Sequence, residues 1–226
     1  MTVGSLKNAY LFLHLGGNNI SRQETVKDLG IYIDSNMKFS NHISQIVAKA
    51  HARAGLIHKC FLSKDRNTLV NAFITYVRPL LEYGVCVWSP YQQEDINKIE
   101  SVQRRFTKRL RGLSSIDYSE RLKILDIRSL QLRRLHHDLI YSYKIIFGLV
   151  DVDCSRFFTV CLNEVTRGHA YKLFVRHSRI DTRKNFFSNR VVSVWNSLPA
   201  VTEDFTSIQR FRTLIERTDL SIFVKF

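Results

Sequence analysis

The sequence predicts a mainly α-helical protein: a helical bundle with a small N-terminal β-hairpin and a mixed C-terminal lobe. Apolar residues recur at spacings of three and four between residues 41 and 147, as on the buried face of a helix, whereas apolar and polar residues alternate only near the N-terminus. Hydrophobic residues make up 45% of the 226 residues and aromatic residues 12%, which is too much for a disordered chain and enough for a sizeable core.

Residues 9–34 are expected to be extended. An apolar run at 9–15 is followed by the turn-forming residues at 16–19, and Leu29, Ile31 and Ile33 then alternate with other residues. We expect a small antiparallel hairpin here, closed at residues 34–36.

Helical spacing begins after this hairpin. Asn41 is a plausible N-cap for the first helix, and Asp65 for the second. Pro79 lies inside the second helix, where it removes a backbone hydrogen bond and is expected to bend the helix. Trp88, in the turn that follows, is expected to pack between helices.

The segment from Tyr76 to Arg111 leads into a helix with two different faces. Glu94 or Asp95 suits its positive N-terminal end, and Gly112 is expected to end it. Its apolar side carries Ile96, Ile99, Val102, Phe106 and Leu110. Its other side carries Lys98, Arg104, Arg105, Lys108, Arg109 and Arg111. Such a helix packs into a core and offers its cations to a polyanion.

The remainder is predicted to alternate between helix and loop. Gly148 is expected to stop a long helix, and residues 149–185 are expected to be loop with one candidate strand at 171–175. Further helices are predicted at 118–125, 128–147, 187–197 and 207–216. Trp195 is expected in the core, with Arg190 on the exposed side. The predicted parts are therefore a hairpin at 1–40, a helical domain at 41–148 and a C-terminal α-rich lobe at 149–226.

The charge favours a nucleic-acid partner, because the formal net charge is +14 and the pI near 9.9. Residues 98–144 hold twelve Lys and Arg against five Asp and Glu, and residues 167–190 hold seven against one, interleaved with aromatic residues. The alternative is that these aromatics are core and the arginines merely solvated. The candidate contacts to nucleic acid are Lys98, Arg104, Arg105, Lys108, Arg109, Arg111, Arg133, Arg134, Arg167, Lys172, Arg183, Lys184 and Arg190.

Seven segments in this order resemble the region that follows the polymerase palm in reverse transcriptases of non-LTR (LINE-like, jockey-type) retrotransposons. They are KDLGIYID (27–34), NHISQIVAKAHAR (41–53), YVRPLLEYGVCVWSP (76–90), IESVQRRFTKRLRGL (99–113), YSERLKIL (118–125), RGHAYKL (167–173) and FFSNRVVSVWNSLP (186–199). The resemblance covers roughly residues 25–218, and it marks residues 1–40 as a remnant of the palm edge.

The resemblance implies a thumb-like domain that grips the template–primer duplex, with RNA, an RNA–DNA hybrid or a DNA duplex as partner. Arg104, Arg105, Lys108 and Arg109 are its candidates for backbone contacts. A polymerase needs paired carboxylates that hold two metal ions, and the sequence has no Asp-Asp pair. We therefore expect no polymerase activity from this chain alone and no cofactor in it, because the Mg²⁺ ions belong to a palm upstream of residue 1.

Other chemistry has little support. The adjacent carboxylates at 94–95 and 203–204 are interpreted as helix caps. Cys154, Cys161, His169 and His177 are spaced too widely for a typical structural zinc site. No catalytic nucleophile motif occurs. The four cysteines form no close pairs and no leader or membrane span is evident, so an intracellular location, nuclear or cytoplasmic, is expected.

Two other functions stay open at this point. The chain could be a helical protein-interaction module, whose apolar faces would bind a separate polymerase palm or a second copy of the chain. It could also be a non-functional relic of a mobile element.

Overall fold

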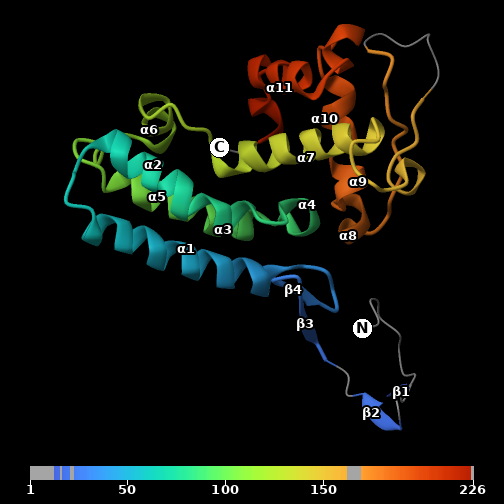
Figure 1. Ribbon diagram of the computed structural model, residues 1–226, viewed down its shortest axis with the longest axis horizontal. Coiled ribbons are helices and arrows are strands. Elements are labelled where there is room, and N and C mark those ends of the chain that lie inside the picture. The colour runs from blue at the N-terminus through green and yellow to red at the C-terminus, as the bar shows by residue number, and fades with distance from the viewer. Residues whose placement is uncertain (1–12, 16, 21–22, 162–168, 225–226) are drawn as a thin grey trace.

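The computed structural model describes residues 13–15, 17–20, 23–161 and 169–224, and it confirms a mainly helical fold with small N-terminal hairpins. The helices of the N-terminal half of the chain pack together in one group, and the helices of the C-terminal part form a second group beside it. The hairpins project away from both groups (Figure 1). None of the helices described is long and apolar enough to cross a membrane.

The N-terminal part forms two hairpins rather than the one predicted. Strand β1 (Leu13–Leu15) pairs with β2 (Asn18–Ile20), and β3 (Thr25–Asp28) pairs with β4 (Ile31–Asp34), both antiparallel. The second turn places Leu29 and Gly30 at positive φ, 44° and 87°, as a two-residue turn that matches strand twist requires. Leu29 is therefore 81% exposed at a turn and is not part of the predicted alternation. Residues 9–12 of the predicted extended run lie outside the described residues.

The start of the first helix is also corrected. Helix α1 (Ser40–Cys60) begins after Phe39, which has a left-handed backbone with φ 61°, so Asn41 is not its N-cap. The Asp34 carboxylate accepts hydrogen bonds from the backbone N–H groups of Lys38 and Phe39, at 3.1 and 2.9 Å. Those bonds hold the hairpin and the helix start together.

The following helices are α2 (Arg66–Tyr76), α3 (Arg78–Glu82), α4 (Val85–Trp88) and α5 (Gln93–Lys108). Asp65 caps α2 as predicted, accepting from Thr68 N at 2.8 Å. Pro79 does more than bend the helix. Because Pro79 has no N–H, the helix is interrupted at Val77. A new helix then starts, with the proline in its first turn.

The prediction for the start of α5 is confirmed, whereas the helix ends earlier than the predicted stop at Gly112. Glu94 and Asp95 lie in its first turn, where carboxylates stabilise the helix dipole. The helix ends at Lys108, and Gly112 follows four residues later with φ 74°, a conformation that favours glycine. Gly148 ends the long helix as predicted. Its N–H donates to the Ile145 carbonyl, and the N–H of Leu149 donates to the Lys144 carbonyl.

The rest of the chain supplies α6 (Tyr118–Ile124), α7 (Leu130–Ile146), α8 (Asp181–Lys184), α9 (Phe187–Arg190), α10 (Val192–Ser197) and α11 (Ile208–Arg217). Short 3₁₀ turns lie at Cys154–Arg156, Thr202–Phe205 and Ser221–Phe223. The candidate strand at 171–175 is reduced to one bridge, between Val160 and Leu173.

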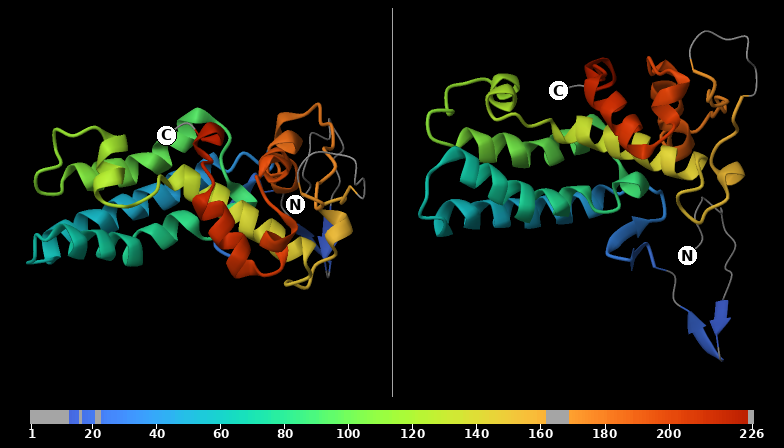
Figure 2. Two further views of the ribbon diagram at one scale, coloured as in Figure 1. Left: turned by 90° about the horizontal axis from the view of Figure 1, so that it is seen from above. Right: turned by 45° about the horizontal axis from the view of Figure 1, so that its top comes forward.

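Two hydrophobic cores share helix α7. The first is built around Trp88 and Phe106 and includes Leu130, at the start of α7. The second is built around Trp195 and Phe211 and includes Leu139, further along α7. Figure 2 shows α7 continuing from the N-terminal helices into the C-terminal group. Trp88 and Trp195 are 1% and 0% exposed, so their predicted core positions are confirmed.

Candidate nucleic-acid interface

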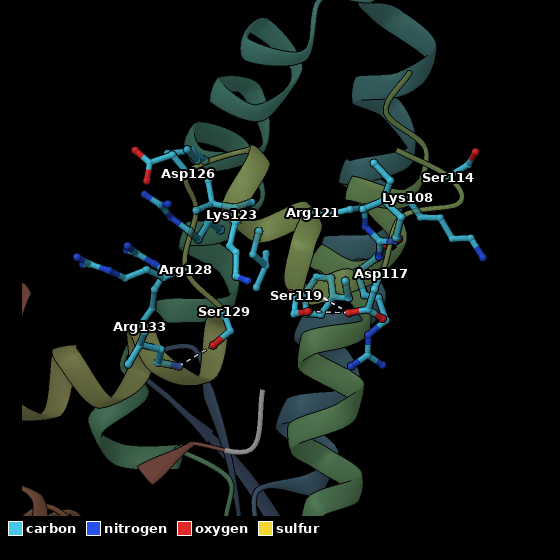
Figure 3. Close-up of a pocket in the computed structure, with 18 of the residues that line it drawn as sticks. Lys108, Ser114, Asp117, Ser119, Arg121, Lys123, Asp126, Arg128, Ser129 and Arg133 are labelled. Atoms are coloured by element: carbon cyan, nitrogen blue, oxygen red, sulfur yellow. Dashed lines mark hydrogen bonds between the residues drawn. The ribbon is translucent and has the colours of Figure 1, made fainter. Parts of the chain in front are cut away.

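An open groove of about 1290 Å³ lies between α2, α3, α5, α6 and the start of α7 (Figure 3). Its lining holds three aspartates, Asp117, Asp126 and Asp219, and seven cationic residues. The cationic residues are Arg78, Arg104, Lys108, Arg121, Lys123, Arg128 and Arg133. An excess of positive charge in a groove focuses the field on an anionic ligand.

Local capping sets the walls of this groove. Asp117 accepts from Ser119 N at 2.9 Å and starts α6, and Ser129 accepts from Leu132 N at 3.2 Å and starts α7. Between the two helices Asp126 takes a positive φ of 48°, which a short polar side chain tolerates. Figure 3 shows Arg128 and Arg133 on one side of the groove and Lys108 and Arg121 on the other.

A buried carboxylate fastens the three helices beneath the groove. Glu100 of α5 accepts from the Tyr118 hydroxyl of α6 and from the backbone N–H groups of Leu130 and Gln131, at 3.1 and 3.2 Å. Those N–H groups belong to the first turn of α7, where a negative charge is favoured. Burial, followed by the charge of Glu100, raises the pKa of Tyr118, so its hydroxyl remains a donor at neutral pH.

Arg121 lines the groove but is committed to the protein. Its buried guanidinium donates to Thr107 Oγ1 at 3.2 Å, to the Ile116 carbonyl at 2.6 Å and to the Arg104 carbonyl at 3.2 Å. It therefore ties the end of α5 to α6 and has little capacity left for a ligand.

The cations of α5 form two rows. Arg104 and Lys108 line the groove, and the Arg104 guanidinium lies 5.1 Å from the centre of the Tyr118 ring. Arg105 and Arg109 instead lie near α1. After burial, their charges are among the causes that lower the pKa of His51 and His58 of that helix.

Four of the predicted cations at α5 are exposed, namely Arg105, Lys108, Arg109 and Arg111. Within the described part of the chain, no ion pair involves any of these four. Lys98 differs, because Glu94 and Asp95 bind its ammonium at 2.7 and 3.1 Å and raise its pKa. The α5 surface therefore offers its free cations near its C-terminal end.

Of the two predicted cations of α7, Arg133 is bound to a carboxylate and Arg134 is buried. Arg133 forms a two-point ion pair with Glu82 of α3, in which its Nη2 lies 3.0 Å from Glu82 Oε2. Burial raises the pKa of Glu82, but hydrogen bonds from His137 and Arg133 outweigh it and hold that pKa at about 2. Arg134 is only 3% exposed, so the expectation that it contacts a ligand at the surface is wrong.

Arg190 is also corrected, because it does not lie on the exposed side of its helix. Its guanidinium binds both oxygens of the buried Asp138 of α7, at 2.8 and 2.9 Å, and donates to the Cys86 carbonyl of α4 at 3.0 Å. Arg190 thus joins α4, α7 and α9.

The second basic stretch is only partly a surface. Lys172 donates to the Asn196 carbonyl, whereas Arg183 and Lys184 are exposed on α8. Among the interleaved aromatics, Phe174 and Phe186 are exposed, and Tyr171 and Phe187 pack into the second core. Arg167 lies outside the described residues.

The predicted contacts did not include Arg78, Arg121, Lys123 and Arg128, which also line the groove. The last three belong to the basic stretch at 98–144, but only the packing of α6 and α7 against α5 shows which of its cations meet in one groove.

His169, one of the four residues considered as zinc ligands, is buried, and its Nε2 lies 3.0 Å from the Trp195 carbonyl. The described residues contain no group of three or more side chains arranged to hold a metal ion.

Comparison with known proteins gives two partial matches. The chain is 26% identical over 126 residues to the uncharacterized protein B0403.1 of Caenorhabditis elegans, a match that covers 54% of this chain and 64% of that protein. It is 30% identical over 103 residues to the RNA-directed DNA polymerase from mobile element jockey of Drosophila melanogaster, covering 43% of this chain and 11% of the polymerase. No family model and no solved structure matches. The chain therefore has a distant, partial similarity to a retrotransposon reverse transcriptase.

Proposed function

We propose that this chain corresponds to the region following the palm of a retrotransposon RNA-directed DNA polymerase, and that it binds the sugar-phosphate backbone of template–primer nucleic acid. RNA, an RNA–DNA hybrid or a DNA duplex would serve as ligand, inside the cell in the nucleus or cytoplasm. The proposal is supported by the cluster of exposed cations at the end of α5, which form no ion pair with the described residues, beside a groove with seven cationic residues against three aspartates.

The geometry supports backbone binding rather than reading of bases. The two rows of α5 point toward different neighbours, so together they present a broad positive surface around the helix. Contacts from Lys and Arg to phosphates give affinity and strong salt dependence without sequence choice. The proposed contact residues are Arg104, Arg105, Lys108, Arg109 and Arg111, with Arg183 and Lys184 as a second patch.

The test is titration of the purified chain against a labelled RNA–DNA hybrid at several salt concentrations. In a variant with Arg104, Arg105, Lys108 and Arg109 all changed to Ala, the salt dependence of log K is expected to fall by up to about 4 in slope, about one for each lost phosphate contact.

The matched control changes Lys38, Lys59, Arg210 and Arg212 to Ala. These residues are exposed, lie outside the proposed interface and remove the same charge. The control should keep most of the wild-type affinity. Equal losses in the two variants would show that only net charge matters, and unchanged binding of the first variant would refute the interface.

The link to a polymerase is tested separately, by sequencing the 5′ end of the native transcript. An upstream reading frame with paired aspartates would support a polymerase that includes this region. A transcript beginning near Met1 would contradict it and leave a solitary binding module or a relic of the element.

A second candidate function is protein interaction, and a specific surface favours it. Tyr83 and Val87, four positions apart in the chain, are both exposed, and the Tyr83 hydroxyl donates to the carbonyl of the exposed Leu29 at 3.0 Å. Such an apolar surface could bind a separate palm or a second copy of the chain. Light scattering of the purified protein tests self-association, and a monodisperse monomer over a range of concentrations would argue against it.

A further inference from the structure

A small, open cavity of about 230 Å³ lies beside α7, apart from the basic groove. Its walls come from the Ser89-Pro90 turn after α4, from α7, from α9 and α10, and from the segment at Phe223 and Val224. Elements far apart in the sequence therefore line it, and Arg134 of α7 forms part of the lining.

Arg134 is unusual among the arginines described. Its side chain is 3% exposed, and neither terminal nitrogen, Nη1 nor Nη2, has a hydrogen-bond partner among the described residues. Buried polar groups are ordinarily hydrogen-bonded, and an unsatisfied donor on a charged group is especially unfavourable. Among the described residues, Arg134 is therefore a buried charged donor that no acceptor satisfies.

The neighbouring carboxylates do not supply that acceptor. Asp138 binds Arg190, Glu82 binds Arg133, and Glu100 binds Tyr118 and the first turn of α7. They act on Arg134 only through their charges. Burial lowers the pKa of Arg134 to about 10, against the effect of Glu100, Asp138 and Glu82, so the guanidinium keeps its charge at neutral pH.

We propose that this cavity binds one small oxyanionic group, of phosphate or carboxylate type, on the guanidinium of Arg134. A guanidinium presents parallel N–H donors that match two oxygens of such a group. Arg190 and Asp138, which also line the cavity, neutralise each other and leave the charge of Arg134 in excess.

Size and lining limit the ligand. The cavity has room for a single oxyanionic group, and Arg134 is the one described cationic residue in its lining that is not bound to a carboxylate. Ser89 and Ser193 add hydroxyl groups to the walls, and these can donate to the remaining oxygens. The site is independent of the proposed nucleic-acid interface, because Arg134 lines only this cavity and not the groove.

The test is calorimetric titration of the full chain with inorganic phosphate and, in a parallel arm, with acetate, at about 0.15 M salt to screen the surface charges. We expect saturable binding of one phosphate per chain. Preference for phosphate or for acetate distinguishes the two kinds of oxyanion. Arg134→Met should weaken binding about tenfold or more, because a charge-assisted hydrogen bond is lost.

Arg212→Met is the matched control, since it removes the same charge from an exposed position of α11 outside both the cavity and the proposed interface, and it should leave phosphate binding unchanged. A second variant covers the case in which Arg134→Met does not fold. Ser193→Phe, at an exposed residue of α10 that lines the cavity, should block the site and keep Arg134 in place.

Loss of binding in Arg134→Met or in folded Ser193→Phe, with retention in Arg212→Met, would support the site. No saturable binding of either anion to the wild type would overturn it and indicate that water satisfies Arg134. Equal binding by the wild type and a folded Ser193→Phe variant would overturn it as well.

Discussion

Helices α5 and α7 each carry an adjacent pair of arginines, Arg104-Arg105 and Arg133-Arg134, and the fold uses the two pairs in opposite ways. The first pair faces the groove and the solvent near α1. In the second pair, one arginine is bound to Glu82 and the other is buried. The same local pattern therefore produces a basic surface in one helix and an internal charge network in the other.

The difference follows from where each helix lies. Helix α7 passes through both cores and contacts α4, α5 and α11, so its polar side chains meet carboxylates and carbonyls from other elements. Helix α5 packs mainly against α1, α6 and α7 through one side. Its own carboxylates lie in the first turn or are buried at Glu100, and the exposed cations near its C-terminal end form no ion pair with any described residue. Availability of a cation is thus decided by the neighbours of its helix.

The largest expected effect comes from breaking the network of α7. Asp138→Ala would leave the largely buried guanidinium of Arg190 without its carboxylate partner and is expected to cost about 3 kcal/mol in the free energy of unfolding. Urea denaturation followed by tryptophan fluorescence measures it. Glu120→Ala, which removes an exposed ion pair with Lys123, should cost less than about 1 kcal/mol. Similar costs for the two variants would show that the Asp138 pair is not a buried determinant of stability.

The second prediction concerns pH and His136 of α7. Burial, followed by the charges of Arg128, Arg133 and His137, lowers the pKa of His136 to about 4 from an ordinary 6.5. As the pH falls, His136 therefore binds a proton in the unfolded chain at a higher pH than in the folded protein. The stability linked to neutral His136 is present above pH 6.5 and is lost as the pH falls toward 4.

From pH 7 to pH 5 this one group should cost about 2 kcal/mol. His136→Gln is expected to reduce the decline by that amount, as measured by urea unfolding at each pH. The matched control is His177→Gln, because the His177 side chain is exposed. A decline as steep in His136→Gln as in the wild type would contradict the assignment.

Helix capping sharpens the comparison at a smaller scale. The hydroxyl of Ser129 caps α7, whereas the side chain of Gln92 makes no capping hydrogen bond at α5. Ser129→Ala should therefore lower the free energy of unfolding by about 1 kcal/mol. Gln92→Ala should change it by no more than about 0.5 kcal/mol. Thermal or urea unfolding of the two variants decides this, and equal effects would speak against Ser129 as the cap.

The smallest effect on stability is expected at α5 itself. Arg105→Ala should change the free energy of unfolding by no more than about 0.5 kcal/mol, since its side chain is exposed and forms no ion pair with the described residues. If the proposed interface is correct, the same variant should reduce the salt slope of hybrid binding by about one. Arg133→Ala should show the reverse pattern, with lost stability and a nearly unchanged slope.

Much of the helical pattern was predictable, because it is encoded in local spacing. The apolar faces of the helices, the capping role of Asp65 and the end of the long helix at Gly148 could be read from residues close together in the chain. The break at Val77, the second hairpin and the helix start at Phe39 were not predicted correctly. In those places backbone details such as the missing N–H of Pro79, and contacts such as those of Asp34, decide between several locally acceptable conformations.

The sequence alone determined the helical class, the basic character of α5 and the core positions of Trp88 and Trp195, because periodicity and side-chain polarity act over a few residues. Only the tertiary structure decided which cations remain accessible. Arg133 and Arg190 bind carboxylates that lie far away in the sequence, whereas Lys98 binds one from its own helix. The acceptor-free position of Arg134 is likewise a result of packing, since a charge is buried or exposed only in relation to what folds against it.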